Sequence, residues 1–135
     1  MQGDLPIAKY RGTLDLLGVE IPCYVLNNGA RVIGRTSMTE MLTGIKGGGG
    51  LEKYIGVSSL TPFINKDLVL ERMVAFRLPE VDGLDKAVKG LSADLAIDVC
   101  RGFVDAMQAS YTPEYKGTKL TSRQVEMAVK ASMFV

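Results

Sequence analysis

The residues closest to a phosphate-binding pattern lie in GIKGGGGLEKYIG, residues 44–56, where consecutive glycines stand between two lysines. The residues concerned are Lys46, Gly47, Gly48, Gly49, Gly50 and Lys53. A Walker loop needs a Lys-Ser or Lys-Thr pair after its last glycine, on a turn from a strand to a helix. Here Leu51 follows the last glycine, and the preceding pattern predicts a helix. We therefore expect no nucleotide and no other cofactor in this stretch.

Two interpretations of the glycine run stay open. Glycine loses more backbone entropy on ordering than any other residue, so the first interpretation is a flexible joint at residues 44–50 within a single domain, 1–135. The second is a backbone that comes close to a polyanion, with Lys46 and Lys53 supplying positive charge.

Paired carboxylates are the second pattern that could do chemistry. Asp94 and Asp98 are one helical turn apart, and Asp105 lies on roughly the same stripe. Such a pair can hold a metal ion or transfer protons. The same predicted helix carries an apolar stripe on its other side, which favours a solvated acidic face. That stripe, predicted to be buried, contains Leu95, Val99, Phe103 and Met107.

The composition excludes several kinds of active site. The chain has no histidine and two cysteines, so one chain has neither a His/Cys zinc site nor a Ser-His or Cys-His nucleophile pair. We expect a protein that is not an enzyme and holds no metal. An enzyme that uses Asp94 and Asp98 remains only a remote alternative.

Basic and aromatic side chains suggest binding instead. Arg31, Arg35 and Lys46 lie near a predicted hairpin, either as an edge that contacts phosphates or as an ordinary solvated edge. Tyr111 and Tyr115 lie in a predicted loop, either as anchors for a partner protein or as residues packed over helix ends. The net charge of +1 argues against a dedicated nucleic-acid domain but leaves room for a local basic patch.

The elements that position these residues predict an α+β fold. Alternating apolar residues and the Asn28-Gly29 turn predict an antiparallel β-meander over residues 8–34. Short helical pieces follow, the first with Thr36 or Ser37 as its cap and Gly44 as its end. MVAFRL predicts a strand, and residues 80–90 are either a polar loop or a hairpin through Asp82-Gly83.

Two long helices complete the predicted fold, over residues 92–109 and 121–134. Ser92 is the expected cap of the first, and Thr121 with Gln124 forms a capping box for the second. Cys23 and Cys100 are expected to be reduced, and no segment reads as a signal peptide or as the roughly 18 apolar residues of a membrane helix. We therefore expect a cytoplasmic protein.

Four stretches, in order, resemble phage and prophage proteins with the P-sixty-three-C domain. GVEIPCYVLNNGARVIGRTSMTEML is similar to that family's "IPC-V-L-DG-RV" hairpin and following helix, and KYIGVSSLTPFINKDL to its next segment. The next two stretches match through Gly90, Ala93, Leu95, Asp98 and Cys100, then through Leu120, Arg123 and Gln124. The family continues past the last helix, so the chain is expected to be a fragment or a short relative.

The resemblance implies a phage or mobile-element accessory or regulatory protein in a bacterial host cell, and the absence of catalytic constellations predicts that it is not catalytic. The first expectation is nucleic-acid binding in an antirepressor-like role, and the front half is reminiscent of KilA-N and Bro-N modules at the level of fold. The alternative is a protein-binding module, such as a stoichiometric inhibitor of a host defence system. The expected partners are therefore nucleic acid or a host protein, together with a homo-oligomer through the C-terminal helix and no membrane.

Overall fold

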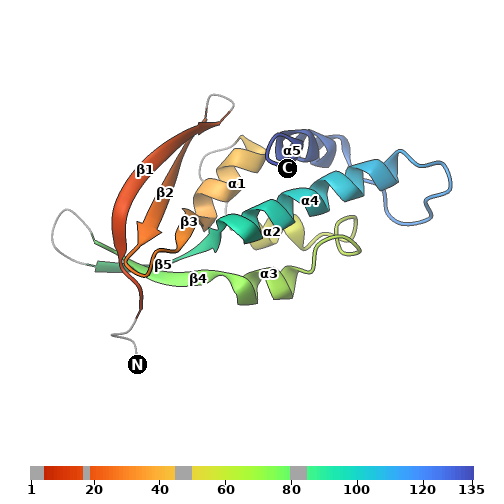
Figure 1. Ribbon diagram of the computed structural model, residues 1–135. Coiled ribbons are helices and arrows are strands. Elements are labelled where there is room, and N and C mark those ends of the chain that lie inside the picture. The colour runs from red at the N-terminus through yellow and green to blue at the C-terminus, as the bar shows by residue number, and fades with distance from the viewer. Residues whose placement is uncertain (1–4, 17–18, 45–49, 80–84) are drawn as a thin grey trace.

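The computed structural model describes residues 5–16, 19–44, 50–79 and 85–135, and it is α+β as predicted (Figure 1). Five strands and five helices follow one another along these residues. In chain order they are β1 (Ala8–Leu16), β2 (Val19–Leu26), β3 (Arg31–Gly34), α1 (Arg35–Thr43), α2 (Leu51–Ile55), α3 (Lys66–Arg72), β4 (Val74–Pro79), β5 (Asp85–Ser92), α4 (Ala93–Ser110) and α5 (Ser122–Ser132).

The predicted N-terminal meander is confirmed. β1 pairs with β2 and β2 with β3, both antiparallel. Gly29 has a φ of 86°, a conformation that glycine adopts without steric cost. The Asn28 side chain accepts a hydrogen bond from the Ala30 N–H at 3.0 Å, so local chemistry alone closes this turn.

Two further strands extend the meander into a five-stranded sheet of order β1-β2-β3-β5-β4. The predicted strand at MVAFRL is β4. It pairs antiparallel with β5, so of the two alternatives for residues 80–90, a polar loop or a hairpin, the hairpin is correct. The turn at residues 80–84 lies outside the described residues. β5 pairs with β3 from Val32 opposite Ser92 to Gly34 opposite Gly90.

The sheet curls until the residues just before β1 reach β4, at the opposite edge of the sheet. Ile7 forms a parallel bridge with Arg77 of β4, and the Arg77 N–H donates to the Pro6 carbonyl oxygen at 2.7 Å. The concave face encloses a small apolar cluster built on Leu26, Val32 and Phe76, all buried. The curl therefore creates a second, smaller core inside the sheet.

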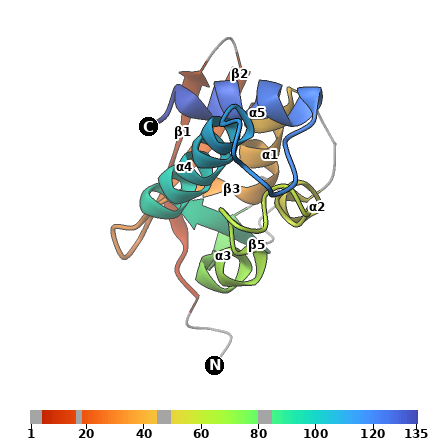
Figure 2. The ribbon, with the colours of Figure 1, turned by 90° about the vertical axis from the view of Figure 1, so that its right-hand side faces the viewer.

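The main core lies between the sheet and the helices, with α4 and α5 lying over it (Figure 2). Leu95, Val99 and Phe103 of α4 are fully buried, as predicted, whereas Met107 is only half-buried. Met107 lies in the last turn of α4 and packs against the edge of the main core.

The helix boundaries confirm three predicted signals and correct one. Ser92 caps α4, Thr121 and Gln124 form the capping box of α5, and Gly44 ends α1 in the left-handed conformation. The prediction that Thr36 or Ser37 caps α1 is wrong. β3 runs directly into α1, so the N-cap is Gly34, which has no side chain to accept a hydrogen bond.

Most of the predicted joint falls outside the described residues, because it covers residues 45–49. Gly44 and Gly50, at its two ends, terminate α1 and precede α2. In the part of the chain that the structure describes, no helix is long and apolar enough to cross a membrane.

Candidate nucleic-acid interface

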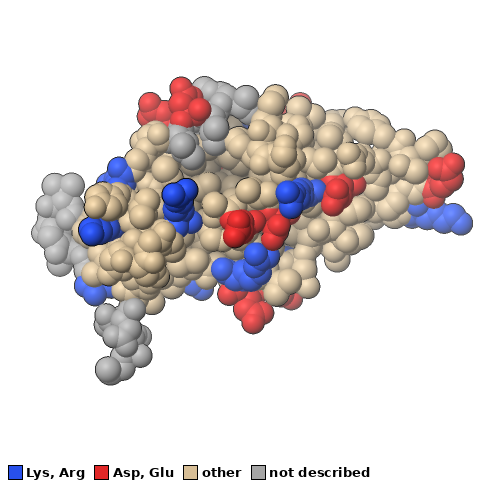
Figure 3. All heavy atoms as spheres, viewed as in Figure 1, with Lys and Arg blue, Asp and Glu red and all other residues tan. Residues whose placement is uncertain are grey.

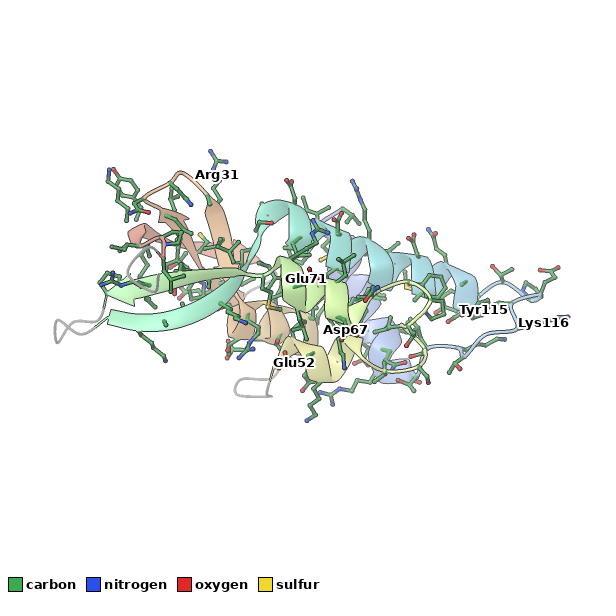
Figure 4. All side chains as sticks on the ribbon, turned by 90° about the horizontal axis from the view of Figure 1, so that it is seen from below. Arg31, Glu52, Asp67, Glu71, Tyr115 and Lys116 are labelled. Carbon is green, nitrogen blue, oxygen red and sulfur yellow. The ribbon has the colours of Figure 1, made fainter. Side chains whose placement is uncertain are left out.

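The structure does not bring the predicted binding residues together at one place. Arg31 lies at the sheet end of the molecule and Tyr115 at the far end of the helices (Figure 4). Arg35 begins α1, and Lys53 lies on the neighbouring α2. Lys46, Gly47, Gly48 and Gly49 lie outside the described residues.

Two of the predicted binding residues, Gly50 and Lys53, lie at α2 and contact neighbours on the same helix. Gly50 is the N-cap of α2, and a Cβ at this position would meet the Glu52 carboxylate. The exposed Lys53 ammonium lies 5.6 Å from the ring centroid of Tyr54.

The two tyrosines after α4 differ from each other. Tyr111 is 71% exposed, which suits a partner anchor. Tyr115 is half-buried against Phe63, with ring centroids 6.1 Å apart, which suits packing. Tyr111 therefore fits the interpretation as a partner anchor, and Tyr115 fits the interpretation as a packed residue.

Asp94, Asp98 and Asp105 are exposed, as predicted from the apolar stripe on the other side of α4. Asp98 accepts a hydrogen bond from Arg72 of α3 at 3.0 Å. Among the described residues no three His, Cys, Asp or Glu side chains are placed to hold a metal ion.

A groove of about 560 Å³ opens onto the concave face of the sheet, beside the start of α1. Tyr24 and Phe76 form its apolar floor, with their ring centroids 5.6 Å apart. Its other lining residues are Gly34, Arg35, Thr36, Ser37, Ala75, Leu78, Lys86, Ala87, Val88 and Lys89. Among the described lining residues, Arg35, Lys86 and Lys89 are cationic, and none is acidic.

The groove is basic because the strands carry more basic than acidic residues, whereas the helices carry both. The strands carry Lys9, Arg11, Arg31, Arg77, Lys86 and Lys89 against the acids Asp15, Glu20 and Asp85. In Figure 3 the coloured charged groups at the sheet end are mostly blue, except for acidic groups near the tip of the β1–β2 hairpin, whereas both colours mix along the helices. A net charge near zero thus conceals a local basic patch.

The first turn of α1 lies at the groove, because Gly34, Arg35, Thr36 and Ser37 all line it. No side chain caps this helix and no acidic residue lies in its first turn. The N-terminus of a helix attracts anions through these unpaired N–H groups and its dipole. Arg35 is partly neutralised, because its guanidinium lies 3.7 Å from the Glu52 carboxylate.

Both thiols are free. Cys100 is buried in the main core, and this burial raises the pKa of its thiol from 9.0 to about 11. A thiol in that environment is a poor nucleophile at neutral pH, because the thiolate is the reactive form.

Comparison with known proteins adds no relative: no family model, curated protein or solved structure matches the chain. The resemblance to the P-sixty-three-C domain family therefore stays a prediction.

Sequence reasoning missed Tyr24, Lys86 and Lys89. The two lysines lie in the segment for which a polar loop and a hairpin both stayed open. A signal was present in the alternation of DKAVKGLS, which fits a strand, but nothing local places that strand beside α1.

Proposed function

We propose that the chain is a non-catalytic regulatory protein of a phage or mobile element that binds nucleic acid through the groove beside α1. The observation that carries the proposal is the gathering of Arg35, Lys86 and Lys89 around the uncapped start of α1. Phosphate contacts from lysine, arginine and helix N-termini position nucleic acids on proteins. The groove offers all three kinds of contact.

Tyr24 supports the same function from the floor of the groove. Its ring is half-buried, with the Arg11 guanidinium 5.6 Å from its centroid. Aromatic faces beside a basic groove stack the bases of single-stranded nucleic acids with little sequence preference. Single-stranded DNA or RNA is therefore the favoured ligand, with the phosphates along the cations and a base on Tyr24.

The test compares two pairs of lysines with the same spacing. The Lys86→Ala/Lys89→Ala variant removes the groove lysines, and Lys116→Ala/Lys119→Ala removes an exposed pair in the loop between α4 and α5. Anisotropy titrations use labelled single-stranded and duplex DNA and RNA over a range of salt concentrations. We expect the groove variant to bind more weakly, with a salt slope reduced by about two, roughly one for each lysine that no longer neutralises a phosphate.

The loop variant is the control for a general loss of positive charge, and it should bind like the wild type. Equal losses of affinity in the two variants would show that general positive charge attracts the nucleic acid and that the groove is not the binding site. Wild-type protein that binds none of the probes at low salt would refute the function.

An apolar hollow on the other face of the sheet favours a second candidate, the protein-binding module. This hollow, of about 420 Å³, lies between the sheet and the start of α4. Tyr10, Val25, Ile33 and Arg31 are among the residues that line it, and Tyr10 is 61% exposed. Exposed aromatic residues and arginine are enriched at protein interfaces. Capture of a host protein that Tyr10→Ala abolishes and Lys86→Ala leaves intact would support this candidate.

A further inference from the structure

The outer edge of β1 is open over most of its length. β1 is the first strand of the sheet and pairs with β2 up to Leu16. Of the described strands no other pairs with β1, and the bridge that closes the curl reaches only Ile7, which precedes it. An unpaired edge of this kind is a template for another strand, because its backbone groups lack partners.

The opposite edge of the sheet is blocked. β4 is bridged by Ile7 at Arg77, donates to the Pro6 carbonyl oxygen, and ends at Pro79. Proline and covering segments are common ways in which proteins protect an edge. β1 has no proline, so strand addition is directed to one side of the sheet.

The charges on β1 change sign along the strand. Arg11, Thr13 and Asp15 are exposed and alternate along β1, so they share one face of the sheet. Asp15 lies opposite Glu20 of β2, which makes the tip of this hairpin acidic, whereas Lys9 and Arg11 make its base basic. Figure 3 shows blue groups at the base of the sheet and red groups near the tip of this hairpin.

We propose that the chain forms a homodimer in which β1 pairs antiparallel with β1 of a second copy, about a two-fold axis through Thr13. In this register Arg11 of each copy faces Asp15 of the other, and the two Thr13 residues face each other. Opposite charges stabilise a directly facing pair of strand residues, and like charges destabilise it. A strand with charges of one sign would be repelled at one end of β1, whereas an antiparallel copy is complementary at both ends.

The dimer joins the two five-stranded sheets into one. Its interface is distinct from the C-terminal helix, which was the predicted site of oligomerisation. α5 exposes Val129, and Met133 at its end is exposed too, and that surface remains free in the β1 dimer. Charge reversals on β1 and a charge introduced at Met133 therefore separate the two modes of association.

The experiment measures the dimer dissociation constant by sedimentation velocity over a range of concentrations. Arg11→Asp and Asp15→Arg each place two like-charged pairs across the interface, and each should weaken the dimer by about tenfold or more. An equimolar mixture of the two variants restores opposite charges across the interface, as does the double variant Arg11→Asp/Asp15→Arg. We expect dimerisation to return in both cases, and Met133→Asp to leave the dimer unchanged.

Other outcomes overturn the proposal. A wild-type chain that stays monomeric at all concentrations would leave the β1 edge to a different partner. A dimer that resists both single reversals, or that Met133→Asp disrupts, would place the interface elsewhere. Single variants that lose the dimer without rescue by mixing would show that the register is wrong, provided that circular dichroism shows them folded.

Discussion

The start of α1 and the start of α5 differ in how their first backbone N–H groups are satisfied. At α5 the Thr121 side chain accepts from the Gln124 N–H, and the Gln124 side chain accepts from the Thr121 N–H at 2.9 Å. The same Gln124 oxygen accepts from the Ser59 hydroxyl at 2.9 Å, which ties α5 to the segment before α3. At α1, Gly34 provides none of these contacts.

In the region of α3, α4 and α5 the helix starts are capped by the chain's own side chains, whereas the start of α1 is free to bind a ligand. α3 and α4 are also capped by side chains, from Asn65 and Ser92, and they face each other through the Arg72–Asp98 ion pair at 3.0 Å. Of the five described helices, α1 and α2 begin without a side-chain cap, and α1 begins in the basic groove. The helical region should therefore carry the stability, and the groove should carry the binding.

Phe103→Ala should have the largest effect on stability. The side chain is fully buried in the main core, and truncating such a phenylalanine costs about 3–5 kcal/mol. Urea unfolding measures the loss. A cost below about 1 kcal/mol would show that this face of α4 does not form the core, and Lys86→Ala, in the groove, should stay within about 0.5 kcal/mol of the wild type.

Alkaline pH should destabilise the helical region through Cys100. Its pKa is about 11 in the folded chain and 9.0 for an ordinary thiol, so between these values the folded state keeps a proton that the unfolded state has lost. The contribution is fully present below pH 9 and is lost as the pH rises towards 11. Unfolding free energies of the wild type and Cys100→Ala should converge over this range; parallel curves would contradict the burial of the thiol.

Thr121→Ala should remove the capping box of α5. Loss of an N-cap side chain typically costs about 1 kcal/mol, within a range of roughly 0.5–2. The midpoint of urea unfolding should fall by the corresponding amount, while affinity for nucleic acid stays unchanged. A loss of affinity in this variant would mean that the two helix starts are not independent.

Gly34→Asp should have the smallest effect on stability and an opposite effect on binding. The position has a φ of −61°, and a Cβ would lie 3.5 Å from the Ser37 hydroxyl, an ordinary contact. An aspartate cap should raise stability by about a few tenths of a kcal/mol, because it satisfies the free N–H groups. The same carboxylate should repel phosphates, so anisotropy should show weaker binding, and Gly34→Ser is the uncharged control. Unchanged affinity in Gly34→Asp would remove the start of α1 from the interface.

The sequence by itself determined the parts of the fold that depend on contacts within a few residues. Asn28 and Gly29 close their turn with their own backbone and side chains, and Gly44 supplies the conformation that ends α1. Ser92 and Thr121 each cap the N–H group three positions later. The apolar stripe of α4 is periodic, so its buried face was visible without knowledge of what covers it.

Only the tertiary structure decided where distant segments meet. β5 lies between β3 and β4, and this order brings Lys86 and Lys89 to the start of α1, far earlier in the chain. The pairing of Gly34 with Gly90 also extends β3 up to the first residue of α1, which is why neither Thr36 nor Ser37 could act as its cap. Pairing between strands far apart in sequence depends on the whole core, whereas a cap or a turn depends on its neighbours, so the basic groove could not be derived from any single stretch of residues.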